Sequence, residues 1–203
     1  SFASYYDPRF MGFGPLRVIN EDKVEAARGF GRHPHRNMEI ISYVVSGQLE
    51  HRDSMGTGSV ITPGEVQLMS AGTGVTHSEM NPSTTDGVHF LQIWIQPAQM
   101  GTAPRYAQKR FDSDGVVLLV SPDGRDDSLV VGQDVDLYRV RLTDEAVNQA
   151  LRGRRGWVQL ISGALTINGA GLRAGDGLMF EDLDAVTLTA TGVVEALLFD
   201  MAV

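Results

Sequence analysis

Hydrophobic residues in this chain gather in short runs, which are rich in Val, Ile, Leu and aromatic side chains and are interrupted by Gly, Pro, Asp or Asn. Short runs with frequent turn residues predict β-strands rather than long helices. One short helix is expected over 143–150, where Thr143 is a suitable N-cap. The predicted strands are 38–45, 58–61, 88–95, 116–120, 157–161, 164–167, 185–189 and 194–199.

Two stretches of the chain share one order of strands and turns. Ser46-Gly47 precedes Pro63-Gly64 in the first stretch, and Ser162-Gly163 precedes Ala174-Gly175 in the second. Each reads as a strand, a Ser-Gly turn, a strand, a turn of Gly and an acidic residue, and a further strand. Two weakly similar β units of this kind predict a duplicated sandwich or barrel.

A boundary between two domains is expected in the segment 97–127, which contains Pro104, Pro122 and the loop SPDGRDD over 121–127. We place the boundary after Pro122, which divides the chain into domains 1–122 and 123–203. All 5 histidines of the chain precede residue 90. The second predicted domain therefore has no imidazole with which to bind a metal ion.

Charge and composition exclude several classes of protein. The net charge of −8 argues against a nucleic-acid surface, because phosphate binding needs clustered Lys and Arg. The short basic stretch Arg152, Arg154, Arg155 is read as a solvated turn. The absence of Cys excludes disulfides, iron–sulfur clusters, thiol catalysis and Cys-based zinc sites. No apolar run approaches the roughly 18 residues of a membrane span, so a cytoplasmic protein is expected.

Two pairs of polar residues have the spacing of a metal site. His33-Pro34-His35 places two imidazoles on one face of a strand, and His77-Ser78-Glu79 does the same for an imidazole and a carboxylate. On facing strands, the pairs would surround one point with three imidazoles and one carboxylate. That donor set suits Fe(II), Ni(II), Co(II), Mn(II) or Cu(II). We therefore predict one divalent metal ion in the first half of the chain.

Glu39 competes with Glu79 for the role of carboxylate ligand. It lies four residues after His35 and so keeps the same strand parity, and spacing alone does not choose between the two. If Glu39 is not a ligand, an ion pair with Arg36 or Arg52 is the simplest alternative.

The remaining two histidines are expected to lie outside the site. His51 stands among charged residues in Glu50-His51-Arg52-Asp53 and is interpreted as a solvated strand end. His89 begins an apolar strand, so it is expected to pack in the core or, less simply, to support a metal ligand.

The spacing of these residues resembles two known motifs. His33-x-His35-x3-Glu39, followed by Gly47, resembles the first cupin motif, although Glu39 to Gly47 is one residue longer than usual. Gly74-x2-His77-x3-Asn81 resembles the second, although Gly72 stands where cupins often have Pro. The wider wording closely resembles the pirin family, and within it the bacterial quercetinase-like branch. The resemblance to this family is specific from about Ser1 to Lys109 and is looser over 154–200. It is clearest in the segments 14–20, 33–43, 69–79 and 90–94.

The resemblance implies an all-β bicupin, in which two double-stranded β-helix (jelly-roll) barrels pack together. It implies one metal ion in the N-terminal barrel, bound by His33, His35, His77 and Glu79, and a C-terminal barrel without metal. The choice of Glu79 over Glu39 rests on the resemblance. Fe(II) is the expected metal, with Ni, Co, Mn and Cu as alternatives.

The same resemblance implies a quercetin 2,3-dioxygenase. A flavonol would bind near the metal, Glu79 would act as the base that takes its 3-hydroxyl proton, dioxygen would open the heterocycle, and carbon monoxide would leave. Met11, Phe13, Met80 and Phe90 are candidate pocket walls, and core packing explains each of them equally well.

The resemblance also implies an alternative, because pirins are known as transcription cofactors and as partners of metabolic enzymes. In this alternative, the metal is structural or redox-sensing and a surface patch contacts a partner protein. The acidic balance of the chain suits a basic protein partner better than DNA. A monomer is the family expectation in either case.

Overall fold

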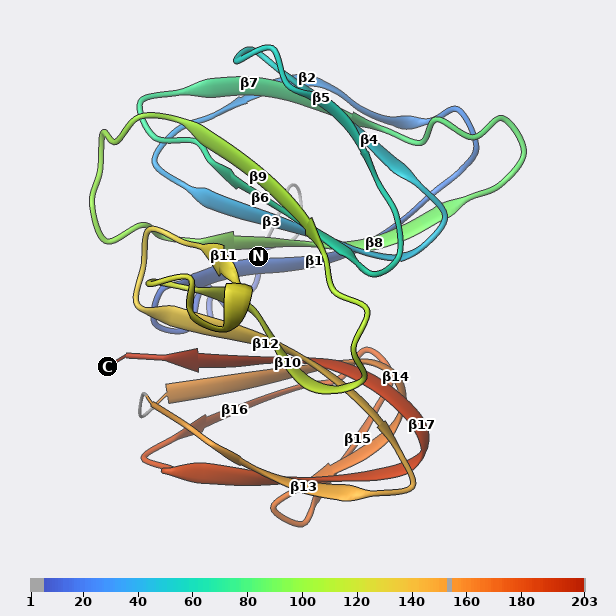
Figure 1. The fold of residues 1–203 in the computed structure, drawn as a ribbon, viewed down its shortest axis with the longest axis vertical. Coiled ribbons are helices and arrows are strands. Elements are labelled where there is room, and N and C mark those ends of the chain that lie inside the picture. Colours follow the sequence, from blue (N-terminus) through green and yellow to red (C-terminus); the bar gives the residue numbers. More distant parts are fainter. Residues whose placement is uncertain (1–5, 153–154, 203) are drawn as a thin grey trace. The chain divides into compact units, whose positions relative to one another are not determined.

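Strands form nearly all of the regular structure of the chain, which a computed structural model describes over residues 6–152 and 155–202 (Figure 1). The one helical element in these residues is the short 3-10 turn η1 (Arg125–Asp127). The all-β prediction is therefore confirmed. No helix in the described residues is long and apolar enough to cross a membrane.

The chain divides into two compact units. The first runs to Phe111 and includes the short segment Val131–Gln133, and the second comprises Asp112–Val130 and the chain from Asp134 onward. The sequence-based cut after Pro122 lies inside the second unit, on the loop that follows its first strand.

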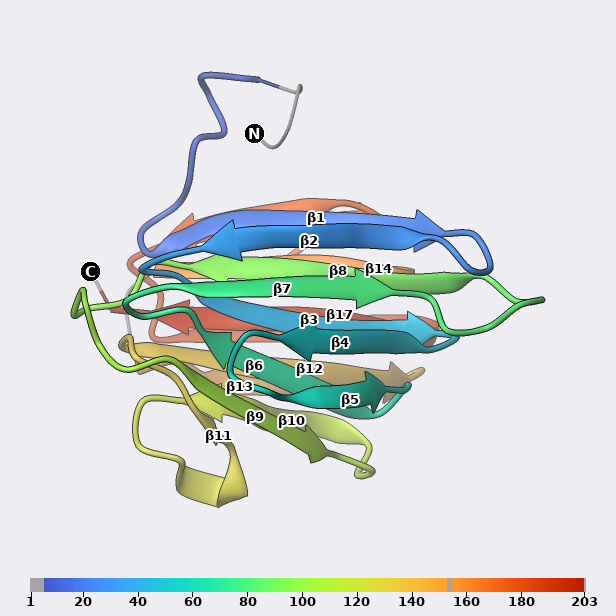
Figure 2. The same ribbon diagram turned by 90° about the horizontal axis from the view of Figure 1, so that it is seen from above.

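Two antiparallel sheets build the first unit. Val44 and Phe90 from one sheet pack with Leu49 and Ile61 from the other, so the sheets face each other across a shared core. The larger sheet has the order β1 (Leu16–Val24), β8 (Val88–Ile95), β3 (Glu39–Ser46), β6 (Glu65–Ser70) and β9 (Arg105–Arg110). The smaller sheet has the order β2 (Gly29–His35), β7 (Val75–Met80), β4 (Leu49–Asp53) and β5 (Gly58–Ile61) (Figure 2).

One sheet with two long strands builds the second unit. Its order is β11 (Leu129–Val130), β10 (Gly115–Ser121), β12 (Val135–Thr143), β17 (Ala185–Met201), β14 (Arg155–Ile167) and β15 (Ala170–Arg173). Two further strands pair outside this order, β13 (Ala146–Ala150) with β17 and β16 (Gly177–Glu181) with β14. The first half of β17 pairs with β13 and the second half with β12, while β14 pairs along both halves, which lets the sheet curl around a core.

Four of the eight predicted strands appear as separate strands within a residue of their expected bounds, and 58–61 and 88–95 match β5 and β8. The predicted helix over 143–150 is wrong, because Ala146–Ala150 pairs as β13 with β17. A distant strand supplies those hydrogen bonds, and the local sequence does not reveal it. The runs 157–161 and 164–167 belong to the single strand β14, and 185–189 and 194–199 belong to β17.

The predicted Ser-Gly turn at Ser162-Gly163 is a bulge inside β14 rather than a hairpin. The register with β17 shifts on both sides of Ser162, and Gly163 has a φ of +86°. A Cβ at Gly163 would lie 2.3 Å from the carbonyl oxygen of Val193, so only Gly allows this approach.

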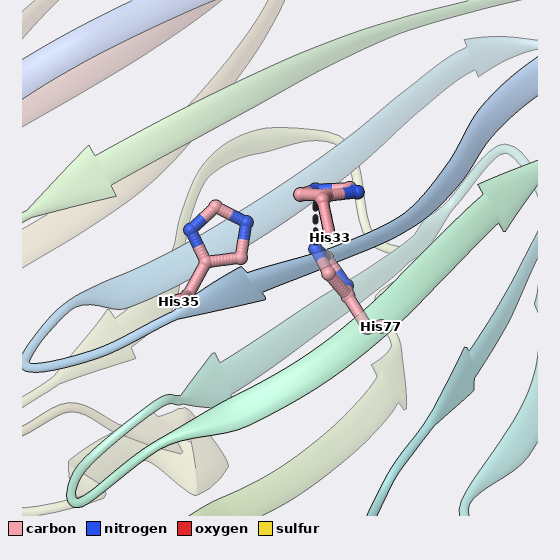
Figure 3. A group of neighbouring side chains, drawn as sticks. All are labelled: His33, His35 and His77. Carbon is pink, nitrogen blue, oxygen red and sulfur yellow. Dashed lines mark hydrogen bonds between the residues drawn. The ribbon is translucent and has the colours of Figure 1, made fainter.

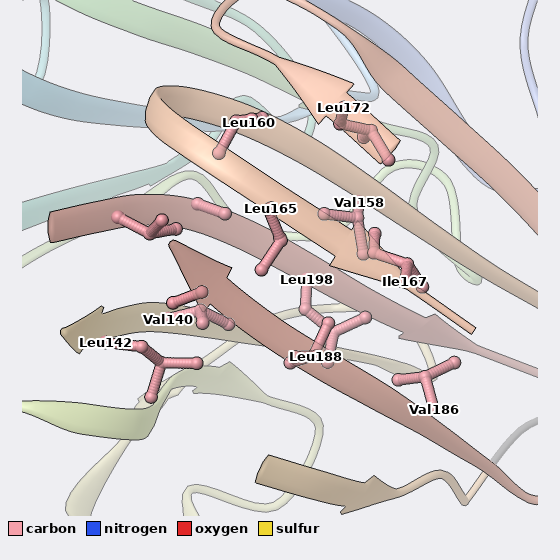
Figure 4. Packing of buried hydrophobic residues seen from close by; sticks show 13 residues of the cluster. Val140, Leu142, Val158, Leu160, Leu165, Ile167, Leu172, Val186, Leu188 and Leu198 are labelled. Atoms are coloured by element: carbon pink, nitrogen blue, oxygen red, sulfur yellow. The ribbon is translucent and has the colours of Figure 1, made fainter. Parts of the chain in front are cut away.

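Apolar side chains from the curled sheet fill the second unit (Figure 4). Leu198 on β17 is fully buried in this cluster, together with Val158 and Leu160 of β14 and Leu188 of β17. The cluster contains 13 buried hydrophobic residues, and their burial stabilises the unit.

Replacement of Leu198 by Ala is expected to lower the free energy of unfolding by about 3 kcal/mol, because it leaves a cavity in this cluster. Chemical denaturation followed by tryptophan fluorescence measures the change. The control is Val193→Thr on the same strand, where the side chain is 72% exposed and the expected change is within about 0.5 kcal/mol. Equal effects for both variants would contradict this account of the core.

Candidate metal centre

The two sequence pairs lie on neighbouring strands of one sheet. β2 and β7 are antiparallel and run side by side, and His33 lies directly opposite His77 in their register (Figure 2). Side chains alternate between the faces of a strand, so His33 and His35 share one face, and His77 and Glu79 share the same face of β7. That face points into the first unit, toward the larger sheet.

Three imidazoles converge at this position (Figure 3). One ring nitrogen each from His33, His35 and His77 lies within 4.8 Å of the other two. The Nε2 atoms of His33 and His77 are 3.0 Å apart. His77 is fully buried, whereas His33 and His35 are half-buried.

The donor atoms of these imidazoles suit a divalent cation. His33 Nδ1 donates to the carbonyl oxygen of Gly31 at 2.8 Å, which leaves a lone pair on His33 Nε2. Two nitrogen ligands bound at right angles to one ion, with bonds of about 2.1 Å, lie about 3.0 Å apart, as these Nε2 atoms do. His35 Nε2 is buried and has no hydrogen-bond partner in the described part of the chain. The residues therefore fit a bound metal ion.

The imidazoles of His35 and His77 are neutral, as metal ligands must be. Burial, followed by the nearby His33 imidazole, lowers the pKa of His35 to about 4. Burial and the neighbouring imidazoles lower the pKa of His77 to about 3, although Asp53 opposes the change. Neither ring carries a proton on its second nitrogen at pH 7.

Glu79 lies beside this cluster and is held by the larger sheet. A carboxylate oxygen of Glu79 lies within 4.8 Å of a ring nitrogen of His77 and of His51. Ser42 Oγ of β3 donates to Glu79 Oε1 at 3.2 Å, and Gln92 Nε2 of β8 donates to Glu79 Oε2. Burial raises the pKa of Glu79, and the two hydrogen bonds limit that rise.

Glu39, the rival carboxylate, lies apart from the imidazoles and belongs to neither group of potential ligands in the described residues. It begins β3, and its side chain accepts hydrogen bonds from Ser70 Oγ at 2.7 Å and from the backbone N–H of Gly132 at 3.3 Å. Ser42, which reaches Glu79, is three residues further along β3 and therefore on the opposite face. The expected ion pair of Glu39 with Arg36 or Arg52 is also wrong, since Arg52 pairs with Glu50.

His51 is the residue that sequence reasoning missed. It was expected to be a solvated strand end, but its side chain is fully buried on β4. His51 Nε2 lies 2.9 Å from Asp53 Oδ2, and His51 Nδ1 lies 3.4 Å from His77 Nδ1. The spacing of His51 and Asp53 is the same two-residue spacing that marked the other pairs, and this signal was available in the sequence.

Two other expectations also differ from the structure. His89 is not in the core, because it is partly exposed at the start of β8 and its Nε2 lies 2.7 Å from Glu21 Oε1. The basic stretch is not a simple solvated turn, because Arg152 Nε lies 2.6 Å from the buried Asp136 and Arg155 Nε lies 2.8 Å from Glu181. Arg154 lies outside the described residues.

A row of polar side chains crosses the larger sheet on its inner face. In register, Gln92 of β8 lies opposite Ser42 of β3, and Ser42 lies opposite Gln67 of β6. Gln67 is fully buried, and neither of its amide atoms has a hydrogen-bond partner in the described residues. Directly opposed residues share a face, so this amide points into the same interior as Glu79.

Apolar and aromatic side chains complete the surroundings of the imidazoles. The Trp94 ring meets His35 edge-on, with ring centroids 5.1 Å apart, and it packs against a cluster of Ile40, Met69 and Val75. An open cavity of about 350 Å³ lies beside His35 and is lined by Pro34, His35, Arg36, Ser54, Gly74 and Thr76. This cavity lies on the His35 side of the site.

The four candidate pocket walls are only partly placed. Phe90 is fully buried in the core between the two sheets, so core packing explains it. Met80 follows Glu79 on β7 and therefore points to the opposite face from the imidazoles. Met11 and Phe13 precede β1, and their assignment to a pocket stays a prediction.

Comparison with known proteins covers both units. The family model described as Pirin matches residues 1–95, and the model described as Quercetinase C-terminal cupin domain matches residues 118–201. A protein of Escherichia coli (strain K12) named quercetin 2,3-dioxygenase is 52% identical over 204 residues, which are 99% of this chain and 88% of that protein. A pirin-like protein of Caulobacter vibrioides is 38% identical over 211 residues and is matched over 90% of its length.

Solved structures show the same similarity. The bacterial pirin YhhW from Escherichia coli in complex with nickel(II) has a TM-score of 0.96 and 50% sequence identity, with 100% of this chain and 89% of that chain covered. The protein YhaK from Escherichia coli has a TM-score of 0.88 and 30% identity.

Proposed function

Because this chain belongs to the pirin family and has the bicupin fold of its relatives, we propose that it is a metal-dependent dioxygenase that opens the heterocycle of a flavonol such as quercetin. The observation that carries the proposal is the cluster of ligand nitrogens from His33, His35 and His77, which borders the buried carboxylate of Glu79. The similarity to proteins named quercetin 2,3-dioxygenase supports it over nearly the whole chain.

The residues that would hold the metal ion are His33, His35, His77 and Glu79. Three imidazoles and a carboxylate suit several divalent ions, of which we propose Fe(II) first and Ni, Co, Mn or Cu as alternatives. The related nickel(II) complex supports a divalent ion of this group. When bound, the ion supplies positive charge that stabilises the deprotonated flavonol and favours its reaction with dioxygen.

Glu79 acts in this proposal as both a ligand and the general base. It receives the 3-hydroxyl proton of the flavonol on a carboxylate oxygen. Ser42 and Gln92 hold it in place through the hydrogen bonds that they donate to its two carboxylate oxygens. The full reaction consumes one flavonol and one dioxygen and yields one ring-opened ester and one carbon monoxide, so every atom is accounted for.

The interior around the site suits a flat aromatic substrate with several hydroxyl groups. Trp94 offers partly buried apolar surface backed by the buried Ile40 and Met69, and the buried amide of Gln67 has a donor and an acceptor without partners in the described residues. The cavity beside His35 is the proposed entry. A buried amide is costly when it has no partner, and a substrate hydroxyl would satisfy it.

The test is turnover of quercetin by purified protein loaded separately with Fe(II), Ni(II), Co(II), Mn(II) or Cu(II) in air-saturated buffer. We expect loss of the long-wavelength flavonol absorbance, with carbon monoxide released in equal amount, for at least one metal. Chelated protein is the control and should be inactive. If no metal supports turnover, the proposed activity is wrong.

Contact with a partner protein, which the family resemblance also suggested, stays a prediction. The same holds for the monomeric state and the cytoplasmic location. A pull-down that compares wild-type protein with the His33→Ala variant tests the predicted contact with a partner protein. If both proteins retain the same partners equally, the metal does not control that contact.

A further inference from the structure

We propose that His51 and Asp53 are positioning residues that fix which nitrogen of His77 carries its proton, so that His77 Nε2 presents a lone pair to the metal. This inference rests on the proposed metal centre. It gives a role to the buried side chains of His51 and Asp53, which the sequence pattern did not explain.

A chain of contacts runs from His77 through His51 to Asp53. β4 lies beside β7, with His51 opposite Glu79 and Asp53 opposite His77 in the register. Asp53 Oδ2 lies 2.9 Å from His51 Nε2, and His51 Nδ1 lies 3.4 Å from His77 Nδ1. The side chains of His51 and Asp53 are both fully buried, so water does not compete for these contacts.

The ring of His51 is also held in its orientation. It packs against the ring of Tyr106 of β9, with centroids 4.9 Å apart. The Tyr106 hydroxyl contacts Ser59 and donates to Gln108 Oε1 at 2.9 Å, so the aromatic ring is itself tethered. Because His51 cannot rotate away, its two ring nitrogens keep their separate partners.

The proton positions follow from what each atom can do. An ionised carboxylate only accepts hydrogen bonds, so His51 Nε2 must carry the proton that faces Asp53. A neutral His51 then has a lone pair on Nδ1, and His77 Nδ1 must donate to it. The only remaining lone pair of His77 is on Nε2, the atom 3.0 Å from His33 Nε2.

His33 also has its proton on Nδ1 and its lone pair on Nε2, but a backbone group rather than a side chain fixes this arrangement. The backbone carbonyl oxygen of Gly31 accepts from His33 Nδ1 and leaves the lone pair on Nε2. Partners of this kind orient metal-binding imidazoles and raise their affinity for the ion. The arrangement is specific because each ring has one nitrogen for its partner and one for the metal.

The substitution Asp53→Asn changes the positions of the protons on His51 and His77 while it keeps the size of the side chain. Asp53 Oδ1 accepts the backbone N–H groups of Met55 at 2.9 Å and Thr57 at 3.0 Å. In the variant, only the amide oxygen can take that place, so the NH₂ group must face His51 Nε2. His51 then carries its proton on Nδ1, donates it to His77 Nδ1, and shifts the proton of His77 to Nε2, where it blocks the metal.

The expected result is a 10- to 100-fold loss of Ni(II) affinity for Asp53→Asn, measured by competition with a chromophoric chelator. Nitrogen-15 NMR of the metal-free protein should show the His51 proton on Nε2 in the wild type and on Nδ1 in the variant. The matched control is Glu50→Gln on the same strand, which removes the same charge from a residue that pairs with Arg52 and should bind Ni(II) normally.

Unchanged Ni(II) affinity in a folded Asp53→Asn variant would overturn the proposal, as would a wild-type His51 that carries its proton on Nδ1. If Asp53→Asn does not fold, His51→Phe decides, since it keeps the ring packing against Tyr106 but removes the acceptor for His77. It should also bind Ni(II) more weakly, and wild-type affinity would contradict the proposal. Neither readout uses flavonol turnover, so failure of the proposed activity is distinguishable from failure of this inference.

Discussion

Replacement of His77 by Ala is expected to weaken Ni(II) binding by roughly 100-fold or more and to abolish flavonol turnover. The loss of a direct ligand should exceed the 10- to 100-fold effect that is typical when an outer partner of a ligand is lost. His77 belongs to both groups of potential ligands, one with His33 and His35 and one with His51 and Glu79. Among the described residues, His77 alone belongs to both groups.

Isothermal titration with Ni(II) measures the affinity, and circular dichroism shows whether the variant folds. The control is His89→Ala, which removes a partly exposed imidazole that pairs with Glu21 on the same unit. Since His77 is fully buried, His33→Ala serves as a second test with less risk to folding. Normal Ni(II) binding by folded variants at both positions would exclude the proposed centre.

Replacement of Glu79 by Gln is expected to lower kcat for quercetin by roughly 10²- to 10⁴-fold, the range for removal of a general base. A neutral amide of the same size can still contact Ser42 and Gln92, so the side chain should stay in place. It cannot take a proton from the flavonol. Steady-state turnover at saturating metal measures this change apart from any loss of metal affinity.

The matched control for Glu79→Gln is Glu39→Gln. Glu39 is also a buried glutamate of the first unit, and it accepts from Ser70 and Gly132 on the other face of the larger sheet. Its amide variant should turn over quercetin within about twofold of the wild type, since it touches no reacting group. If Glu39→Gln loses activity and Glu79→Gln keeps it, the assignment of the base is reversed.

Residue spacing correctly predicted which side chains share a face wherever both residues of a pair lie on one strand. The two-residue spacing of His33 and His35, and of His77 and Glu79, predicted shared faces because side chains alternate along a strand. The same reasoning fails across a turn. Glu39 has the parity of His35 by count, but Asn37 between them has a φ of +51° and Glu39 belongs to a strand of the other sheet.

The errors also have a physical cause in common. The segment expected to be a helix became β13 because β17 supplies its hydrogen bonds from about forty residues away. His51 looked solvated among charged neighbours, yet alternation turns it inward while Glu50 and Arg52 pair outside it. Each outcome depends on which strand lies alongside, and that information is not local.

By itself, the sequence determined that this chain is all-β, that its imidazoles lie in the first half, and that they come in pairs on single strand faces. These properties follow from composition and from the period of two. Only the tertiary structure decided that His33 faces His77 across neighbouring strands and that Asp53 and His51 lie behind His77. It also places Glu79 beside the imidazoles, where spacing left Glu39 and Glu79 open and the pirin resemblance favoured Glu79. Strand pairing brings these residues together, because hydrogen bonding and burial of the whole sheet select the neighbours of each strand.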